Sequence, residues 1–322
     1  MKKPSIRDVA AMANVSTATV SHVLNSTRYV SEETVQKVRN AIEALQYTPN
    51  ITARGFRTGK THTIGFILPD ISNHFFSSLV EVVENALSSN GYHLIIAITK
   101  EDFRLELEHL QYFSAGVTDG IILASTATDT AEIRSVLPSN FPITFVDRRP
   151  DKMIWDNVTI TSERAIYDAV NYLYVKGHRK IGFLSGLPTI STSIERLNAY
   201  KRALSQNNLP FSEDMVSLGN SLVENTKAGT ESLLRVGCTA IVVCNGLMTY
   251  EAQQYLWNTN NADSNKIDIV GFKDEYRLVA GSVFVSQPID ELGIRTAEQI
   301  LYRIQNPDAP TKEIVLNSLF VC

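Results

Sequence analysis

Two different patterns of hydrophobic positions divide the chain into two parts. Over the first 47 residues, apolar positions return every three or four residues, which is typical of amphipathic helices. The pattern predicts three short helices, from Ser5 to about Met12, from Ser16 to Leu24 and from Ser31 to about Leu45. Each opens with a serine that is suited to cap free backbone amides. Because the helices are short, we expect them to share one small core and to form a domain that ends near Tyr47.

From Thr63 onward, strand-like apolar runs alternate with amphipathic helices. This alternation predicts parallel sheets with helices on both faces. The Ile-Gly-Phe sequence that starts at Ile64 returns at Ile181, which indicates two similar subdomains with a ligand cleft between them. The expected strands cover residues 64–68, 94–96, 120–123, 180–184, 240–243 and 267–271, and the clearest helices run from Leu79 to Leu87 and from Leu105 to Phe113.

A hinge candidate lies between the two patterns. Tyr47-Thr48-Pro49-Asn50 breaks the third helix, and Ile51–Arg57 is too short to stay helical alone in water. We therefore expect an all-α headpiece at residues 1–47, a hinge helix and linker at 48–60, and a two-lobed α/β domain of doubly wound parallel sheets at 61–322. The N-subdomain covers about 61–159 and 288–317, and the C-subdomain covers about 160–287 and 318–322.

Charge separates the same two parts. The whole chain carries a formal net charge of -4. Residues 1–60 hold nine Lys and Arg against four Asp and Glu, a net +5, whereas the remainder holds 21 against 30, a net -9. A small basic head on an acidic body is expected when only the head meets nucleic-acid phosphate.

Several function classes find no support in the sequence. The three cysteines lack metal-ligand spacing, the six histidines are scattered, and the chain has no phosphate-binding glycine loop, His-Glu-x-x-His or Gly-x-Ser-x-Gly motif. We therefore expect no enzyme activity, no cofactor and no metal. No apolar signal segment opens the chain and no run approaches membrane-spanning length, so we expect a cytoplasmic protein without a membrane partner.

Several motifs resemble the lactose-repressor (LacI/GalR) family of transcriptional regulators. In the headpiece the resemblance rests on Ile6–Ala10, Val15–Asn25 and Tyr47–Asn50. The resemblance implies a helix-turn-helix headpiece, a periplasmic-binding-protein-like effector domain, and a homodimer on pseudo-palindromic operator DNA. It also implies a repressor, here of a carbohydrate-utilisation operon, which an effector in the cleft controls allosterically. In the larger domain, similar signatures follow in the family's order at residues 69–73, 117–122, 146–148, 177–181, 195–197, 270–272 and 287–288.

The resemblance places the second headpiece helix in the major groove and the hinge helix in the minor groove of the operator. Thr17, Ala18 and His22 share one face of the second helix, from which side chains can reach base edges. Ser16 suits a phosphate contact, a helix cap, or both. The expected DNA-binding residues are Ser5, Ser16, Thr17, Ala18, Thr19, Ser21, His22, Asn25, Tyr47, Asn50, Ala53, Arg54, Phe56 and Arg57.

Two of these residues differ from the family's usual ones. His22 stands where many members have arginine; it either makes a single bond to a base, which changes the preferred half-site, or contacts only the DNA backbone. Phe56 stands where leucine usually wedges into a central base step of the operator. Phenylalanine is another apolar wedge, and packing between hinge and body is the alternative.

Family effectors are mostly sugars and some purines, held by an aromatic residue and by polar groups of both lobes. Phe75 and Phe76 match the aromatic position, and one of the two is suited to core packing instead. Arg196 matches the effector-binding arginine, and Asn245 matches a polar residue of the second lobe. The expected effector-binding residues are Asn73, Phe75, Phe76, Arg148, Arg164, Thr192, Arg196, Asn245 and Lys273.

Three departures from the family pattern make the expected cleft more cationic. Gly246 and Lys273 stand at positions that commonly carry aspartate, and Arg164 falls close to one that is often acidic or neutral. Because a cationic pocket selects carboxylate or phosphate, we expect an acidic or phosphorylated sugar as effector. Alternatively, Asp274 or Glu275 takes over the aspartate's role and the effector is a neutral sugar.

Other functions remain as alternatives. A solute-binding protein of a sugar transport system shares the two-lobed architecture, but it predicts an export signal and no basic head. A regulator that answers to a protein corepressor is a further alternative. The chain has no leucine heptad tail after its last strand-like run, so we expect a dimer rather than a tetramer.

Overall fold

The structure is a computed structural model that describes residues 4–25, 28–48, 59–219, 223–259, 267–273 and 283–322, without the side chains at 25, 223 and 224. The chain forms two compact units, residues 1–61 and residues 62–322. Within the described residues, no helix combines the length and apolar character needed to cross a membrane.

The first unit confirms the three predicted headpiece helices. They are α1 (Ile6–Ala13), α2 (Thr17–Asn25) and α3 (Glu32–Leu45), and their buried side chains, among them Val9, Val20 and Val38, form one small core. Three helices this short owe their stability to that shared core, because isolated helices of this length are marginal in water.

The helix starts differ in how they are capped. The Ser16 hydroxyl accepts the Thr19 amide of α2 at 3.0 Å, as predicted. At α1, the Asp8 carboxylate reaches back to the Ser5 amide at 2.7 Å. The predicted cap at Ser31 is wrong: its hydroxyl lies 2.9 Å from the Thr34 hydroxyl and bonds no helix amide.

The first lobe of the second unit is built on a parallel sheet of order β11-β5-β4-β3-β1-β2. Its strands read as nearly unbroken apolar runs because helices cover both faces. In register, Ile64 of β1 lies between Leu94 of β2 and Gly120 of β3. The strands are β1 (Thr63–Leu68), β2 (His93–Ile98), β3 (Gly120–Leu123), β4 (Ile143–Val146), β5 (Asp156–Thr161) and β11 (Glu313–Asn317), and the helices are α5 (His74–Ser88), α6 (Phe103–Ser114), α7 (Ala131–Val136) and α12 (Ile289–Gln305).

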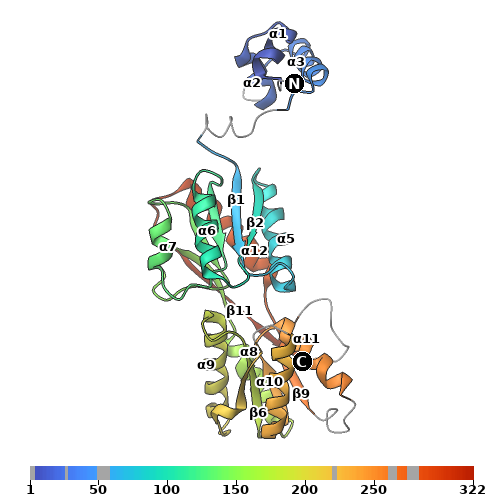
Figure 1. Cartoon of the computed structure of the whole chain (residues 1–322), viewed down its shortest axis with the longest axis vertical. Coiled ribbons are helices and arrows are strands. Elements are labelled where there is room, and N and C mark those ends of the chain that lie inside the picture. Colours follow the sequence, from blue (N-terminus) through green and yellow to red (C-terminus); the bar gives the residue numbers. More distant parts are fainter. Residues whose placement is uncertain (1–3, 26–27, 49–58, 220–222, 260–266, 274–282) are drawn as a thin grey trace. The chain divides into compact units, whose positions relative to one another are not determined.

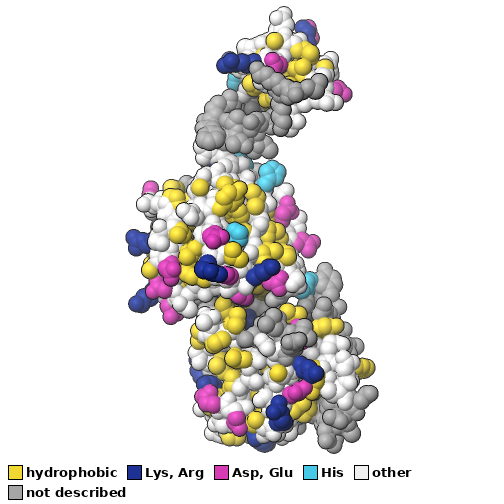
Figure 2. Space-filling view, viewed as in Figure 1, with side chains coloured by type: hydrophobic (Ala, Val, Ile, Leu, Met, Phe, Trp, Pro, Cys, Tyr) yellow, Lys and Arg dark blue, Asp and Glu magenta, His cyan; other side chains and the backbone are white. Residues whose placement is uncertain are grey.

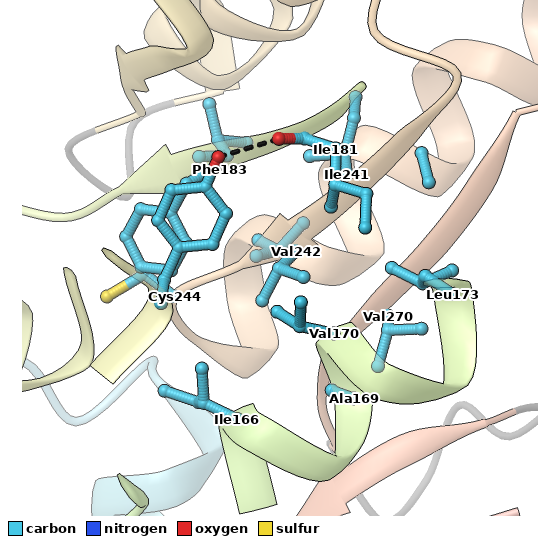
Figure 3. Close-up of a cluster of buried hydrophobic side chains, with 14 of the residues drawn as sticks. Ile166, Ala169, Val170, Leu173, Ile181, Phe183, Ile241, Val242, Cys244 and Val270 are labelled. Carbon is cyan, nitrogen blue, oxygen red and sulfur yellow. Dashed lines mark hydrogen bonds between the residues drawn. The ribbon is translucent and has the colours of Figure 1, made fainter. Parts of the chain in front are cut away.

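The second lobe repeats this plan with the order β12-β10-β9-β8-β6-β7, in which only the pair β10–β12 is antiparallel. Figure 3 shows its core, where side chains of β6, β8 and β9 pack against α8. The strands are β6 (Ile181–Ser185), β7 (Val216–Leu218), β8 (Ala240–Val243), β9 (Asp268–Phe272), β10 (Phe284–Ser286) and β12 (Leu319–Val321), and the helices are α8 (Glu163–Val175), α9 (Ser191–Gln206), α10 (Val223–Val236), α11 (Gly246–Asn258) and the 3₁₀ turn η1 (Glu213–Met215).

Three chain crossings join the lobes, between β5 and α8, between β10 and α12, and between β11 and β12. In Figure 1, the two sheets lie in separate lobes of this unit and β11 leads from one to the other. Two of the crossings touch, because the buried hydroxyls of Ser162 and Ser318 lie 3.0 Å apart. The predicted fold class is therefore confirmed: an all-α headpiece and two α/β lobes with parallel sheets.

Candidate functional site

A cavity of about 370 Å³ lies between the lobes, where the carboxyl ends of their parallel strands meet. The first residues after β1, β4, β6, β8 and β9 all line it, and so does the loop after β2. Its size suits a small organic molecule. The lining residues are Pro69, Asp70, Asn73, Phe75, Phe76, Lys100, Glu101, Asp147, Arg148, Gly186, Leu187, Ile190, Thr192, Ser193, Arg196, Cys244, Asn245, Gly246, Leu247, Lys273 and Gln287.

Three helices begin at this cavity. The Asn73 side chain accepts the Phe75 amide of α5 at 3.1 Å, and the Asn245 side chain accepts the Met248 amide of α11 at 2.9 Å. Thr192 in the first turn of α9 lines the same space. The positive ends of three helix dipoles are therefore directed at the cavity, because each helix follows a strand of a parallel sheet.

The two neighbouring phenylalanines divide their roles. Phe76 is only 2% exposed and belongs to the first lobe's core, whereas Phe75 is half-buried. Their rings meet edge to face with centroids 5.2 Å apart. Phe76 is therefore chiefly a core residue, and Phe75 has the more accessible ring at the cavity.

Arg148 is engaged by carboxylates of its own lobe. Its guanidinium donates to both oxygens of Glu101, at 2.7 and 2.9 Å, and lies over the Phe76 ring at 5.4 Å. The Asp147 carboxylate is 3.8 Å from the Arg148 Nε. The positive charge of Arg148 is thus largely balanced within the protein.

Asp147 is a buried carboxylate at the cavity. It is 7% exposed, and within the described residues its carboxylate accepts no hydrogen bond. Burial raises the pKa of the Asp147 carboxyl, and the positive charges of Arg148 and Arg196 offset this only in part. Its backbone is left-handed, with φ of 61°. The carboxylate is therefore available as an acceptor for a ligand hydroxyl.

The second lobe supplies the other cations. Arg196 is 7% exposed; one N–H donates to the Cys244 carbonyl at 2.7 Å, and its guanidinium stacks over Phe272 at 3.9 Å. These contacts hold the guanidinium plane in place. Lys273 directly follows β9, with its Nζ 5.3 Å from the centre of the Phe284 ring.

The headpiece presents one exposed turn of α2. Ser16, Thr17 and Ala18 are exposed, whereas Thr19, Ser21 and His22 are half-buried. Ser5 is exposed at the start of α1, and Tyr47 packs against the headpiece core. The side chain of Asn25 lies outside the described residues, as do Asn50, Ala53, Arg54, Phe56 and Arg57 of the hinge.

Known proteins match this chain along nearly its whole length. The family described as "Bacterial regulatory proteins, lacI family" matches residues 5–50, and that described as "Periplasmic binding proteins and sugar binding domain of LacI family" matches residues 61–314. The chain belongs to the LacI family. It is therefore a DNA-binding transcriptional regulator with a small-molecule effector domain, and not an enzyme.

Individual relatives agree with this assignment. The HTH-type transcriptional repressor PurR of Vibrio atlanticus is 30% identical over 312 residues, which cover 94% of this chain and 93% of that protein. The ribose operon repressor of Haemophilus influenzae is 31% identical over 318 residues, which cover 97% and 95%. The structure of the lac repressor dimer bound to operator and the anti-inducer ONPF shares the fold, with a TM-score of 0.87, 22% identity, and coverage of 100% of this chain and 98% of that one.

Eight of the nine effector-binding residues predicted for this LacI-family chain line the cavity: Asn73, Phe75, Phe76, Arg148, Thr192, Arg196, Asn245 and Lys273. The prediction that Arg164 belongs there is wrong. Its side chain is 77% exposed and pairs with Asp168 at 3.0 Å, one turn along α8. The pair lies along the surface of α8, and Arg164 is not among the residues that line the cavity. The alternative residues Asp274 and Glu275 lie outside the described residues.

The carboxylates of the cavity were not predicted from the sequence. Asp70, Glu101 and Asp147 line it beside the four cations Lys100, Arg148, Arg196 and Lys273. Asp147 stands directly after a buried strand, at the same place in its lobe as Lys273 does in the other. That position was a signal that could have identified it. The cavity is consequently less cationic than we expected from its arginines and lysines alone.

Proposed function

We propose that this LacI-family protein is a repressor whose operator affinity is set by an acidic or phosphorylated sugar bound between the lobes. The observation that carries the proposal is the convergence of three helix N-termini with Arg196 and Lys273 on one cavity. Helix N-termini favour anions, and a guanidinium held in place can donate two parallel hydrogen bonds to a carboxylate or phosphate.

Arg196 is the best-placed anion ligand. Within the described residues, its only hydrogen bond uses one N–H, to the Cys244 carbonyl. Because stacking on Phe272 fixes its plane, the remaining N–H groups can bind an anion with little loss of side-chain entropy. Arg148, by contrast, already holds a carboxylate.

The sugar ring has its own partners. Asp147 offers an acceptor for hydroxyls, and the Asn73 amide group keeps donor capacity while its oxygen caps a helix. Phe75 offers an apolar surface on which the carbon face of a sugar can pack. The proposed effector thus has a polyhydroxylated body and one anionic group.

Operator binding follows from the headpiece. We assign base contacts to Thr17, Ala18 and His22 of α2, and phosphate contacts to the short polar residues around them. The effector changes the relation between the lobes and thereby the hinge segments, so that operator and effector alter each other's affinity by the same factor. We expect the effector to release the operator.

A dimer places two headpieces on a pseudo-palindromic site. The edge strand β2 carries three isoleucines, Ile95, Ile96 and Ile98, that are 36–40% exposed. Figure 2 shows hydrophobic side chains on the surface of the lobe that contains β2. An apolar sheet edge in water invites pairing with another chain, and we propose that it forms part of the dimer interface.

An effector screen on operator-bound protein tests the proposal. The panel contains neutral sugars, the matching sugar phosphates and the matching sugar acids, each titrated at constant salt because operator affinity depends steeply on salt. We expect only anionic members to release the operator. Tight binding of a neutral sugar alone would sink the proposal and favour the second candidate, a neutral-sugar regulator, which the balanced charge of Arg148 supports.

A further inference from the structure

The bidentate salt bridge between Arg148 and Glu101 has the geometry with which arginine binds the carboxylate of a ligand. Both Nη atoms of Arg148 donate to the two oxygens of one carboxylate, at 2.7 and 2.9 Å. This parallel arrangement is the one that arginine uses for the carboxylate or phosphate of a ligand. Both residues line the cavity, so an internal carboxylate occupies an anion position in its wall.

The backbone that presents Glu101 is in an unfavourable conformation. Lys100 and Glu101 lie in the loop after β2, and both are left-handed, with φ of 53° and 62°. Two successive side-chain-bearing residues rarely adopt this region. The Glu101 carboxylate that binds Arg148 is therefore presented by a loop with an unfavourable backbone conformation.

The two partners differ in how firmly they are held. The Arg148 side chain is 12% exposed and lies over Phe76, whereas the Glu101 side chain is 32% exposed. The carboxylate can regain water more easily than the guanidinium can. Glu101 also borders a second groove, of about 280 Å³. Glu101 is thus the more solvent-accessible member of the pair.

We propose that Glu101 is a resident counter-ion that competes with the anionic group of an effector for Arg148, and so determines how strongly the cavity prefers anionic over neutral effectors. This inference rests on the proposed anionic effector for its biological meaning. A neutral ligand leaves the Arg148–Glu101 bridge in place. An anion that reaches Arg148 replaces one carboxylate by another group of the same charge, so its net gain is small.

Removal of the resident charge tests this directly, with inorganic phosphate as the probe. Calorimetric titration compares the wild-type protein with Glu101→Gln, with Glu132→Gln and with the double variant Glu101→Gln/Arg148→Gln. Glu132 is exposed beside the same second groove, and none of the described contacts joins it to Arg148. It is therefore the matched control.

We expect Glu101→Gln to bind phosphate about tenfold to a hundredfold more tightly than wild type, the range expected for a charge-assisted hydrogen bond. Glu132→Gln should stay within about twofold of wild type, and the double variant should lose the gain because the guanidinium is gone. A Glu101→Gln protein that binds phosphate no better than wild type overturns the inference, and so does a gain that persists without Arg148.

Two further measurements keep the outcome decisive. Thermal melting shows whether Glu101→Gln is folded, and Glu101→Ala replaces it if it is not. The effector screen on wild-type protein is scored separately. If only neutral sugars release the operator, the proposed effector class fails, whereas the phosphate titration still decides whether Glu101 competes for Arg148.

Discussion

Asp147 shows, at the scale of one residue, how a proposed ligand-binding group conflicts with stability. Its carboxylate is buried, accepts no hydrogen bond within the described residues, and has a left-handed backbone. Because burial raises the pKa of this carboxyl, its charged form is less favourable in the folded protein than in the unfolded chain. Such a cost is common where a group is kept ready for a ligand.

The first prediction concerns Asp147→Asn. Asparagine keeps the shape and tolerates the left-handed backbone, so the free energy of unfolding should rise at neutral pH. The gain should shrink as the pH falls, because the wild-type carboxyl then takes up its proton and loses the charge that burial disfavours. Effector affinity should fall at every pH. Denaturant unfolding at several pH values measures the stability change, with Asp308→Asn on the exposed surface as control. A less stable variant at neutral pH would contradict the argument.

The second prediction concerns Lys273, which lines the cavity from the second lobe. Lys273→Asp reverses the charge at this point, so release of the operator by an anionic effector should be abolished. Operator affinity without effector should remain largely unchanged, because the headpiece is a separate compact unit. Operator titrations with and without effector measure both quantities. An unchanged response to the effector would remove Lys273 from the site.

At the scale of elements, the start of α2 is capped by the hydroxyl of Ser16, the residue before the helix. Ser16 is exposed, and its hydroxyl accepts the Thr19 amide, so it caps the helix. When the Thr19 hydroxyl donates to the Ser16 oxygen, 2.8 Å away, the Ser16 O–H can donate to a phosphate oxygen. Capping and DNA contact are therefore compatible, so both roles that the sequence indicates for Ser16 can be filled at once.

The third prediction separates these roles by comparing two serines. Ser16→Ala should lower the free energy of unfolding of the headpiece by about 1 kcal/mol, the usual contribution of an N-cap. Ser31→Ala should cost clearly less, because the Ser31 hydroxyl bonds no helix amide. Scanning calorimetry of the full chain, read at the headpiece transition, provides the measurement. Equal decreases in the free energy of unfolding for the two variants would show that the hydrogen bond from the Thr19 amide to Ser16 does not stabilise the headpiece.

At the scale of the whole molecule, assembly determines whether the headpieces can act together. A palindromic operator needs two headpieces at a fixed separation, so a monomer should bind it far more weakly than a dimer. We propose that the exposed isoleucines of β2 form part of the interface that holds this dimer together.

The fourth prediction is that Ile96→Lys shifts the protein towards monomer and weakens operator binding. A lysine on an apolar edge strand carries a charge that pairing would have to bury. Ile194→Lys on α9, where the isoleucine is 44% exposed, is the matched control and should leave the dimer intact. Sedimentation at several protein concentrations measures the assembly. If Ile96→Lys remains dimeric at the concentrations at which wild type is dimeric, β2 is not part of the interface.

Much of this architecture could be read from the sequence, because it rests on local pattern. Hydrophobic period distinguishes helices from strands, and the apolar runs at 64–68 and 240–243 became buried strands within a residue of their predicted bounds. The motifs that resemble the LacI family likewise pointed to Arg196 and Asn245, and both residues line the cavity. Strand order was then constrained by the doubly wound topology.

Only the tertiary structure decided how the charges are distributed. Arg164 and Arg148 look alike in sequence, yet one pairs with Asp168 on an exposed helix face and the other with Glu101, 47 residues away. Coulomb interactions depend on distance and burial, which sequence spacing does not provide. Periodicity therefore determined the two lobes and the place of the cleft, whereas the fold decided which cations face a ligand and which already hold a carboxylate.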